Sequence, residues 1–300
     1  QNIEIGMPKR VAVITGGASG IGFSIAERCA KDGFNVVVAD IREDALEEAA
    51  SRLKKLDAEI VSVKTNVKEL SSMKNLCAKT IERFGRIDYF FNNAGVSGGG
   101  NLWESVEAVR HVLETNLFGI IHGIQAFVPF MIKQDFESHI VNTASVQGMN
   151  AAIGAYGIAK HGVVAASEAL HYDLSTRFVA PKVKVHCLCP SFIKTPLLEN
   201  SSVTVPKDVS DEKSASVANL TETELEGLNV RINTVMEVFE SAMTVNELVD
   251  RTFQGIENGD FYIYTHPEFS KADIKARMKN LLDQTPPELP PNPEVRRVFG

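Results

Sequence analysis

Short apolar runs rich in β-branched residues alternate along the chain with longer segments in which apolar residues recur every three or four positions. The first pattern is typical of buried strands, and the second is typical of amphipathic helices. Because parallel strands are joined by long, usually helical crossovers, we predict an α/β fold with one doubly wound parallel sheet of about seven strands and helices on both faces. The predicted strands are 10–15, 35–40, 60–64, 87–92, 139–143, 182–188 and 261–264, and helices are predicted at 21–31, 42–55 and 70–84.

Two stretches interrupt this alternation. Residues 201–229 are rich in Ser, Thr and acidic residues and form either a substrate flap or a plain surface insertion. Residues 266–300 hold half of the 12 prolines, which disfavours a compact terminal domain. We expect a short amphipathic helix at 271–282 followed by an extended tail. The chain is therefore divided into a leader at 1–9, a single domain at 10–265 and a Pro-rich C-terminal extension at 266–300.

The composition fits a globular protein with a large core, since 44% of the residues are hydrophobic and 23% are charged. The net charge of -7 disfavours binding to nucleic acid and favours small-molecule ligands. No stretch approaches the roughly 20 apolar residues that span a bilayer, and the N-terminus does not resemble a secretory signal. We therefore expect a cytoplasmic protein that does not bind membranes.

The cysteines and histidines do not suggest a metal site. Cys29, Cys77, Cys187 and Cys189 are scattered through strand-like and helix-like segments, and no His residue stands at zinc-ligand spacing from them. We expect four reduced thiols in the core and no bound metal.

A glycine-rich turn follows the first predicted strand, with the sequence Thr15-Gly-Gly-Ala-Ser-Gly-Ile-Gly22, and a helical pattern follows the turn. Glycines let the backbone at a helix N-terminus approach a pyrophosphate, which the unpaired N–H groups attract. Phe23 and Ser24 stand where a P-loop has Lys and Ser/Thr, so a phosphotransferase is disfavoured. The turn also differs from the common G-x-G-x-x-G pattern. It indicates either a dinucleotide site or close packing of a helix on a strand.

Asp40 ends the second predicted strand. A carboxylate there can accept hydrogen bonds from the adenosine ribose hydroxyls and would repel the 2′-phosphate of NADP, which favours NAD. Arg42 could instead hold a 2′-phosphate, so NADP remains the less favoured alternative. Asp40 could also simply cap the helix that begins near Arg42.

Ser145, Tyr156 and Lys160 form a candidate catalytic set. Ser145 comes just after a predicted strand, and Tyr156 and Lys160 are four residues apart, on one face of a helix. A neighbouring ammonium and an oxidised nicotinamide would both stabilise a phenolate, and lowering its pKa from about 10 to about 7 requires roughly 4 kcal/mol. The Ser hydroxyl could then hold a substrate oxygen while Tyr156 exchanges its proton. A Tyr-x-x-x-Lys pair alone is also common on ordinary helix surfaces.

These motifs follow one another along the chain in the order found in the short-chain dehydrogenase/reductase family. Residues 10–265 therefore resemble that family, and the resemblance implies a Rossmann-like catalytic domain. The family's T-G-x-x-x-G-x-G turn is matched by Thr15, Gly16, Gly20 and Gly22, and its N-N-A-G motif by Asn92, Asn93, Ala94 and Gly95. Its helical Asn is matched by Asn116, and its Ser-Tyr-Lys set by Ser145, Tyr156 and Lys160.

The resemblance implies a role for each residue. Tyr156 would be the general acid and base, Ser145 would orient the substrate oxygen, and Lys160 would bind the nicotinamide ribose and lower the Tyr156 pKa. Asn116 would hold a water molecule in a proton relay. The implied cofactor-binding residues are Gly16, Ser19, Gly20, Ile21, Gly22, Asp40, Ile41, Asn66, Val67, Asn93, Ala94, Gly95, Tyr156, Lys160, Pro190, Ile193 and Thr195.

Three positions depart from the family pattern. Asn66 replaces the Asp that usually accepts a hydrogen bond from the adenine amino group, and its side-chain carbonyl can still accept that bond. Ser191 replaces the Gly after Pro190, which makes the approach to the nicotinamide bulkier. Ser145 and Tyr156 are closer in sequence than in many relatives, so the loop between them, which helps line the substrate pocket, is short.

Apolar residues flank Ser145 or follow Pro190, and they form either a substrate wall or ordinary core. The candidate substrate residues are Ser145, Gln147, Met149, Ile153, Phe192 and Leu197, with Leu198 beside them. A wall of this kind would suit a hydrophobic or cyclic secondary alcohol or ketone, such as a terpenoid- or steroid-like molecule.

Two functions are carried forward. The leading hypothesis is an NAD-dependent alcohol dehydrogenase or carbonyl reductase, and the alternative is a non-redox isomerase, cyclase or sensor that keeps NAD bound on the same scaffold. The predicted helix at 155–178 is rich in Ala, Gly and Ser. Since this helix packs between subunits in the family, the resemblance implies a homodimer or homotetramer.

Overall fold

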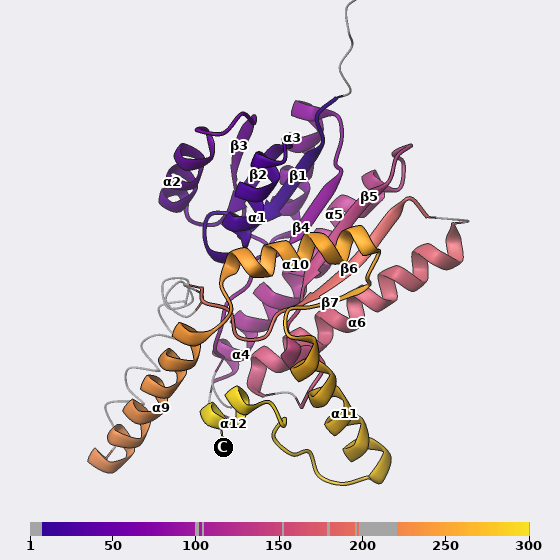
Figure 1. Cartoon of the computed structure of the whole chain (residues 1–300). Helices are drawn as coiled ribbons and strands as arrows, with labels where there is room; N and C mark the ends of the chain where they lie inside the picture. Colours follow the sequence, from indigo (N-terminus) through magenta and orange to yellow (C-terminus); the bar gives the residue numbers. More distant parts are fainter. Residues whose placement is uncertain are drawn as a thin grey trace, which may run out of the picture.

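The computed structural model describes residues 8–99, 102–103, 105–151, 153–178, 181–195, 197 and 221–299. Its centre is one parallel sheet of seven strands in the order β3-β2-β1-β4-β5-β6-β7 (Figure 1). The strands are β1 (Val11–Thr15), β2 (Asn35–Asp40), β3 (Ile60–Lys64), β4 (Tyr89–Asn92), β5 (Ser138–Thr143), β6 (Val183–Cys189) and β7 (Tyr262–Tyr264). All seven predicted strands are confirmed, with ends that differ from the prediction by at most two residues.

Helices cover both faces of the sheet, as the alternation of strand side chains requires. Along β2, Val36 and Val38 pack in one core cluster, and Val37 and Ala39 pack in the other. The first cluster contains side chains of α1 (Gly20–Lys31), α2 (Glu43–Leu53) and α10 (Val245–Asn258). The second contains side chains of α3 (Leu70–Phe84), α5 (Gly119–Met131) and α6 (Gly154–Arg177). The predicted doubly wound Rossmann-like fold is confirmed.

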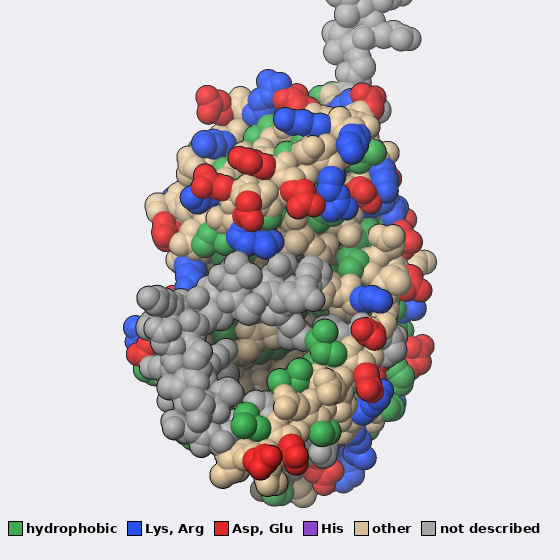
Figure 2. Space-filling view, turned by 90° about the vertical axis from the view of Figure 1, so that its left-hand side faces the viewer, with side chains coloured by type: hydrophobic (Ala, Val, Ile, Leu, Met, Phe, Trp, Pro, Cys, Tyr) green, Lys and Arg blue, Asp and Glu red, His purple; other side chains and the backbone are tan. Residues whose placement is uncertain are grey.

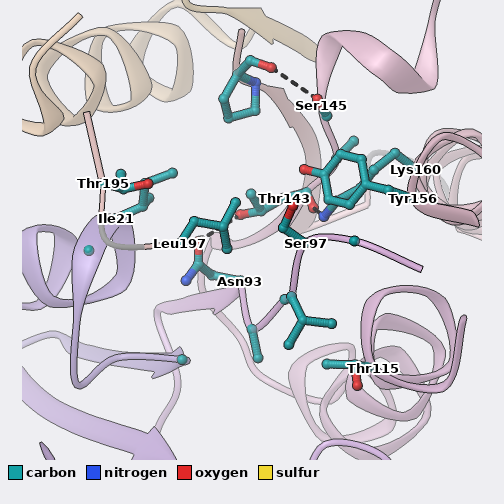
Figure 3. A pocket seen from close by; sticks show the side chains of 18 of the residues that line it. Ile21, Asn93, Ser97, Thr115, Thr143, Ser145, Tyr156, Lys160, Thr195 and Leu197 are labelled. Atoms are coloured by element: carbon teal, nitrogen blue, oxygen red, sulfur yellow. Dashed lines mark hydrogen bonds between the residues drawn. The ribbon is translucent and has the colours of Figure 1, made fainter. Parts of the chain in front are cut away.

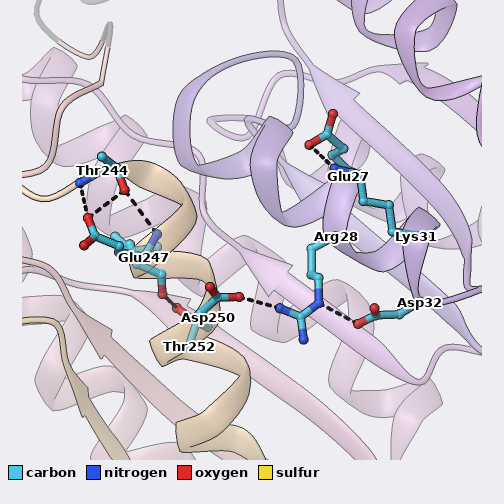
Figure 4. A network of polar contacts seen from close by, with 9 residues as sticks. Glu27, Arg28, Lys31, Asp32, Thr244, Glu247, Asp250 and Thr252 are labelled. Atoms are coloured by element: carbon cyan, nitrogen blue, oxygen red, sulfur yellow. Dashed lines mark hydrogen bonds and ion pairs between the residues drawn. The ribbon is translucent and has the colours of Figure 1, made fainter.

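Helix α10 is fixed by polar contacts at its start and on its outer surface (Figure 4). Its N-cap residue is Thr244, whose hydroxyl accepts a hydrogen bond from the Glu247 N–H, while the Glu247 carboxylate accepts one from the Thr244 N–H. Arg28 of α1 joins this helix to α10, because its Nη1 lies 2.7 Å from Asp250 Oδ1. Its Nε lies 2.8 Å from Oδ2 of Asp32, which follows the last residue of α1. The Arg28–Asp250 pair joins α10 to α1, and the two helices also share one apolar cluster on the sheet.

The strand order reverses between β1 and β4, which are neighbours in the sheet. In doubly wound sheets, a crevice opens at the carboxyl ends of the strands at this point, because the crossovers leave it in opposite directions. The glycine turn follows β1 there, and the Asn93-Ala94-Gly95 segment follows β4. Helix α4 (Val106–Leu113) and the short π-helix η1 (Glu114–Phe118) continue the chain from β4 toward α5.

The C-terminal extension differs from the prediction. Helix α11 (Pro267–Asp283) begins earlier than expected, and a further helix, α12 (Pro293–Phe299), replaces the end of the extended tail. The reason is that both helices start at a proline, where the fixed φ and missing N–H favour the first helical position. The predicted helix at 271–282 is therefore present with an earlier start, and the predicted extended tail is wrong at 293–299.

The predicted flap at 201–229 lies largely outside the described residues. Its last residues form the start of α9 (Glu222–Ser241), and the proposal that the segment is a flap stays a prediction. Figure 1 shows α9, α11 and α12 at the same end of the sheet. No helix in the described ranges is long and apolar enough to cross a membrane. The prediction of four reduced core cysteines is confirmed, since all four are buried free thiols.

Candidate active site

One cavity of about 680 Å³ lies at the carboxyl ends of the strands. This volume is within the range of small-molecule and cofactor sites. The predicted site residues that line it are Gly16, Ser19, Gly20, Ile21, Asp40, Ile41, Asn66, Val67, Asn93, Ala94, Gly95, Ser145, Gln147, Ile153, Tyr156, Lys160, Pro190, Phe192, Ile193, Thr195 and Leu197. The fold therefore gathers almost the whole predicted set around a single space.

Three predicted site residues lie behind the cavity wall. Gly22 packs under the glycine turn, where an added Cβ would lie 2.1 Å from the Gly16 carbonyl oxygen. Asn116 is fully buried and hydrogen-bonds to backbone. Met149 packs against a core cluster, and its sulfur accepts a hydrogen bond from the Tyr264 hydroxyl. It is not among the residues that line the cavity, and its place in a substrate wall stays a prediction. Leu198 lies outside the described residues.

The glycine turn packs so closely on the turn after β4 that a side chain at Gly16 would collide with it. Gly16 has a φ of +63° and an added Cβ would lie 2.9 Å from Ala94 Cα. Gly20, with a φ of 52°, begins α1. Ser19 is the N-cap residue of α1, and its side chain makes no capping hydrogen bond. The first N–H groups of α1 therefore have no capping hydrogen bond from the Ser19 side chain. A helix start of this kind at a cavity wall suits a phosphate of a dinucleotide.

The turn after β4 is bonded directly to the glycine turn. The Asn93 and Ala94 N–H groups donate to Thr15 Oγ1 at 2.9 and 3.1 Å, and Asn93 Nδ2 donates to the Thr15 carbonyl oxygen at 3.1 Å. The Thr143 hydroxyl donates to Asn93 Oδ1 at 3.2 Å. The side chain of Asn93 therefore links β1, β4 and β5 where the strand order reverses.

Asp40 stands at the end of β2, with 9% of its surface exposed at the cavity. Its carboxylate accepts hydrogen bonds from the Ala18 N–H at 3.3 Å and from the Arg42 N–H at 3.2 Å. Arg42 is itself the N-cap residue of α2, so the Asp40 carboxylate bonds to the loop rather than to the first turn of that helix. The Arg42 guanidinium lies 3.9 Å from Asp40 Oδ1 and donates to Ser19 Oγ at 3.3 Å.

Ser145, Tyr156 and Lys160 come together at the other side of the cavity (Figure 3). Ser145 follows β5, donates to the Pro190 carbonyl oxygen at 3.2 Å and accepts from the Gln147 N–H at 3.2 Å. Tyr156 and Lys160 are one turn apart on α6. Lys160 Nζ lies 5.5 Å from the centre of the Tyr156 ring and donates to the Thr143 carbonyl oxygen at 2.8 Å. The arrangement places a hydroxyl, a phenol and an ammonium around one point of the cavity.

Asn116 supports this group from the π-helix η1. Its Oδ1 accepts from the Val96 N–H at 2.7 Å and its Nδ2 donates to the Val96 carbonyl oxygen at 2.8 Å. A Cβ added at Gly95 would lie 3.2 Å from Asn116 Oδ1 and 3.7 Å from Lys160 Nζ, so the three residues are close neighbours. Single π turns are frequent at functional sites. The water relay through Asn116 stays a prediction.

Burial sets the protonation of the catalytic pair. It raises the pKa of Tyr156 to about 12, against the opposing effect of a hydrogen bond with Ser145. Burial also lowers the pKa of Lys160 to about 8. The expected lowering of the Tyr156 pKa is therefore absent from the protein alone, because loss of solvent around the phenolate outweighs the favourable contacts. Tyr156 holds its proton at neutral pH and is poised first as an acid.

Several cavity residues were missed by the sequence reasoning. His111 is buried, with its Nδ1 3.1 Å from Lys68 Nζ, and Lys68 also lies 3.4 Å from Glu114 Oε2. Lys68 directly follows Asn66-Val67 and could have been proposed from that position. Val235 of α9 and Val295 of α12 also line the cavity, but no local motif marks them. In the described part of the chain, no group of three or more His, Cys, Asp or Glu side chains could hold a metal ion.

The chain is similar in sequence to known dehydrogenases and reductases. Residues 10–206 match the family described as short chain dehydrogenase. The chain is 29% identical over 285 residues to the CLA biosynthesis dehydrogenase/reductase of Lactiplantibacillus plantarum, covering 93% of this chain and 96% of that protein. It is 33% identical over 216 residues to the 1-deoxy-11-beta-hydroxypentalenate dehydrogenase of Streptomyces arenae, covering 70% and 76% of the two chains.

A solved structure of similar fold is a short-chain dehydrogenase/reductase from Burkholderia phymatum in complex with NAD. It aligns with a TM-score of 0.83 and 33% identity, covering 93% of this chain and 96% of that one. The family match spans most of the chain and includes the glycine turn and the Ser-Tyr-Lys group. The protein is therefore a member of the short-chain dehydrogenase/reductase family, whose enzymes are oxidoreductases with nicotinamide cofactors.

Proposed function

We propose that the protein transfers hydride between NAD(H) and a hydrophobic secondary alcohol or ketone. The observation that carries this proposal is the arrangement of Ser145, Tyr156 and Lys160 at one side of a cavity whose other side holds the glycine turn and Asp40. The glycine turn and the start of α1, which line this cavity, fit a dinucleotide pyrophosphate. When bound, the nicotinamide supplies the ring carbon that donates or accepts the hydride.

The residues of the chain supply position and proton transfer. The Ser145 hydroxyl, which donates to the Pro190 carbonyl oxygen, can turn to donate to the substrate oxygen instead. In ketone reduction, Tyr156 gives its phenolic proton to that oxygen as hydride reaches the carbon. Lys160, 5.5 Å from the ring centre, stabilises the phenolate that remains. In alcohol oxidation the phenolate takes the hydroxyl proton, and a positive charge near the ring promotes that state.

The apolar side chains near Tyr156 support a hydrophobic substrate. Ile153, Phe192 and Leu197 line the same cavity as Ser145 and Tyr156. Burying the apolar part of a substrate against such side chains contributes roughly 25 cal/mol per Å². A polar sugar or a small hydroxy acid would leave these side chains without matching contacts.

The choice of NAD rests on Asp40. We expect Asp40→Ser to weaken NADH binding by roughly tenfold, because a charge-assisted hydrogen bond to a ribose hydroxyl is lost. The same substitution should strengthen NADPH binding, since it removes a negative charge beside the 2′-phosphate and leaves Arg42 in place. Isothermal titration of both cofactors measures the change, with Asp44→Ser, an exposed carboxylate in the first turn of α2, as the control. A wild-type preference for NADPH would contradict this assignment.

The lowered pKa of Lys160 predicts a pH dependence of cofactor binding. Below its pKa of about 8 the side chain is an ammonium that can donate a charge-assisted hydrogen bond to the nicotinamide ribose, and above that pH it is neutral. NADH affinity should therefore fall as pH rises through 8, by up to about tenfold per pH unit. Lys160→Arg keeps its charge and should give a flat profile. The same decline in both proteins would show that another group causes it.

A panel of hydrophobic secondary alcohols and ketones tests the reaction itself. Incubation with NAD or NADH, followed by absorbance of the reduced nicotinamide, should show turnover with at least one bulky member. Tight NADH binding without turnover of any member would instead favour the non-redox alternative.

A further inference from the structure

The C-terminal extension reaches the cavity. Val295 of α12 is 3% exposed and lines the same space as Tyr156 and Phe192, and Val235 of α9 lines it as well. Figure 2, which views the side of the molecule on which α9 lies, shows a hollow with hydrophobic side chains at its border. Two valines from distant parts of the sequence therefore belong to the wall of the active-site cavity.

Helix α12 is held in place by specific polar contacts. The Asn292 side chain accepts a hydrogen bond from the Glu294 N–H at 2.9 Å, and Arg296 Nε donates to the Pro290 carbonyl oxygen at 3.2 Å. An ion pair between Arg297 and Glu237 joins α12 to α9. The Arg297–Glu237 pair thus joins α12 to α9, and Val295 and Val235 of these two helices line the same cavity.

Asp273 of α11 connects the C-terminal extension to the loop between Ser145 and Tyr156. It is 1% exposed, and its two carboxylate oxygens accept hydrogen bonds from the Asn292 N–H at 3.1 Å and from Asn150 Nδ2 at 3.3 Å. Asn150 lies in the loop between Ser145 and the start of α6, and the neighbouring Met149 carbonyl oxygen accepts a hydrogen bond from Arg277 Nη1 at 3.4 Å. The extension and the Ser145 loop are therefore bonded to one another.

A buried carboxylate at this position is costly for folding. Burial raises the pKa of Asp273, because the carboxylate has lost solvent that its hydrogen bonds only partly replace. Buried polar groups of this kind can define one arrangement of the chain rather than add stability. The arrangement that Asp273 defines is the position of α12 relative to the loop that bears Ser145.

We propose that the C-terminal extension forms the distal wall of the substrate chamber, with Val295 limiting the size of the apolar group that a substrate can carry and Asp273 positioning that wall against the Ser145 loop. This inference rests on the proposed function, because it assigns the extension to the selection of hydrophobic alcohols and ketones. A larger side chain at Val295 shortens the chamber, and a smaller one lengthens it. The Asp273 carboxylate acts only through Asn150 and Asn292.

Substrate profiles of Val295→Phe and Val295→Ala test the wall. For Val295→Phe we expect kcat/KM to fall by at least about tenfold for the bulkiest alcohols that the wild type oxidises, with little change for the smallest, since one misfitting group in an apolar pocket has an effect of this order. Val295→Ala should shift the preference toward bulkier alcohols. NADH affinity should not change in either variant. The control is Leu282→Phe on α11, where the native side chain is 81% exposed. Equal changes for small and bulky alcohols would overturn the proposal.

A binding measurement keeps this test independent of the reaction. If the wild type oxidises none of the panel, the proposed function fails, and the wall can still be examined with anilinonaphthalene sulfonate added to the NADH complex. Val295→Phe should then weaken binding of this apolar probe by at least about threefold relative to Leu282→Phe, because the chamber is smaller. Equal probe affinity in the two variants would overturn the proposal by itself.

The positioning role of Asp273 has a separate test. Asp273→Ala leaves the Asn292 N–H and Asn150 Nδ2 without their acceptors, and we expect kcat to fall and the preference between bulky and small alcohols to weaken, while NADH affinity stays unchanged. Asp273→Asn should recover most of the activity, since the new amide can accept from the Asn292 N–H and donate to Asn150 Oδ1 after that side chain turns. Unchanged kcat in Asp273→Ala, or no recovery in Asp273→Asn, would contradict the role.

Discussion

Tyr156→Phe is expected to lower kcat by between about 10²- and 10⁴-fold, which is the usual contribution of a positioned general acid or base. The phenolic oxygen is the only group removed, and the ring keeps its place against Lys160. NADH affinity should therefore stay close to that of the wild type, so that the loss appears in turnover rather than in cofactor binding. Steady-state rates with the best alcohol of the panel, together with titration of NADH, measure the two effects separately.

The control for this substitution is Tyr172→Phe, on the same helix, where the native side chain is 69% exposed. It should leave both turnover and NADH affinity unchanged. Full turnover in Tyr156→Phe would remove Tyr156 from the mechanism and with it the interpretation of the Ser-Tyr-Lys group.

Gly22→Ala is the second substitution with a large expected effect. The added Cβ would lie 2.1 Å from the Gly16 carbonyl oxygen and 2.9 Å from Asn93 Nδ2, so the backbone of the glycine turn has to move. Overpacking of this kind typically costs about 1–3 kcal/mol, roughly ten- to a hundredfold in an equilibrium constant. We expect NADH affinity to fall by that factor and Tm to fall by several degrees.

A matched control is Gly227→Ala in α9, where an added Cβ meets no atom within 4 Å. Alanine there should stabilise the helix by up to about 1 kcal/mol. Thermal unfolding and NADH titration of the two variants distinguish a steric effect at the turn from a general effect of adding a methyl group. Wild-type NADH affinity in Gly22→Ala would contradict the close packing of the turn.

Local patterns were sufficient to predict the sheet and to bring the glycine turn and Asp40 to one cavity. The apolar run at 35–40 coincides with β2, because a buried parallel strand is apolar on both faces and ends where Asp40 turns toward the cavity. The glycine turn could be located from spacing alone, since a positive φ at Gly16 and the close approach of Gly22 leave little choice of residue. These features depend on a few neighbouring residues.

The distal part of the cavity depends on contacts between distant segments, and it was missed for that reason. Val295 resembles any apolar residue in a Pro-rich tail until α12 is placed beside α9. Met149 stands near Ser145 in the sequence, yet its side chain turns toward Tyr264 and the core. The pKa of Tyr156 follows from burial, which the spacing of Tyr156 and Lys160 does not reveal. Sequence spacing could identify Tyr156 and Lys160 but not their surroundings.

Direct hydride transfer to NAD beside Tyr156 is tested most directly by following deuterium. The panel of hydrophobic secondary alcohols, labelled with deuterium at the carbinol carbon, is incubated with enzyme and NAD, and the recovered nicotinamide is examined by mass spectrometry. We expect NADH that carries one deuterium for each ketone formed, with no label lost to water. Ketone formed without label in the nicotinamide ring, or no ketone from any member despite NADH binding, would contradict the claim.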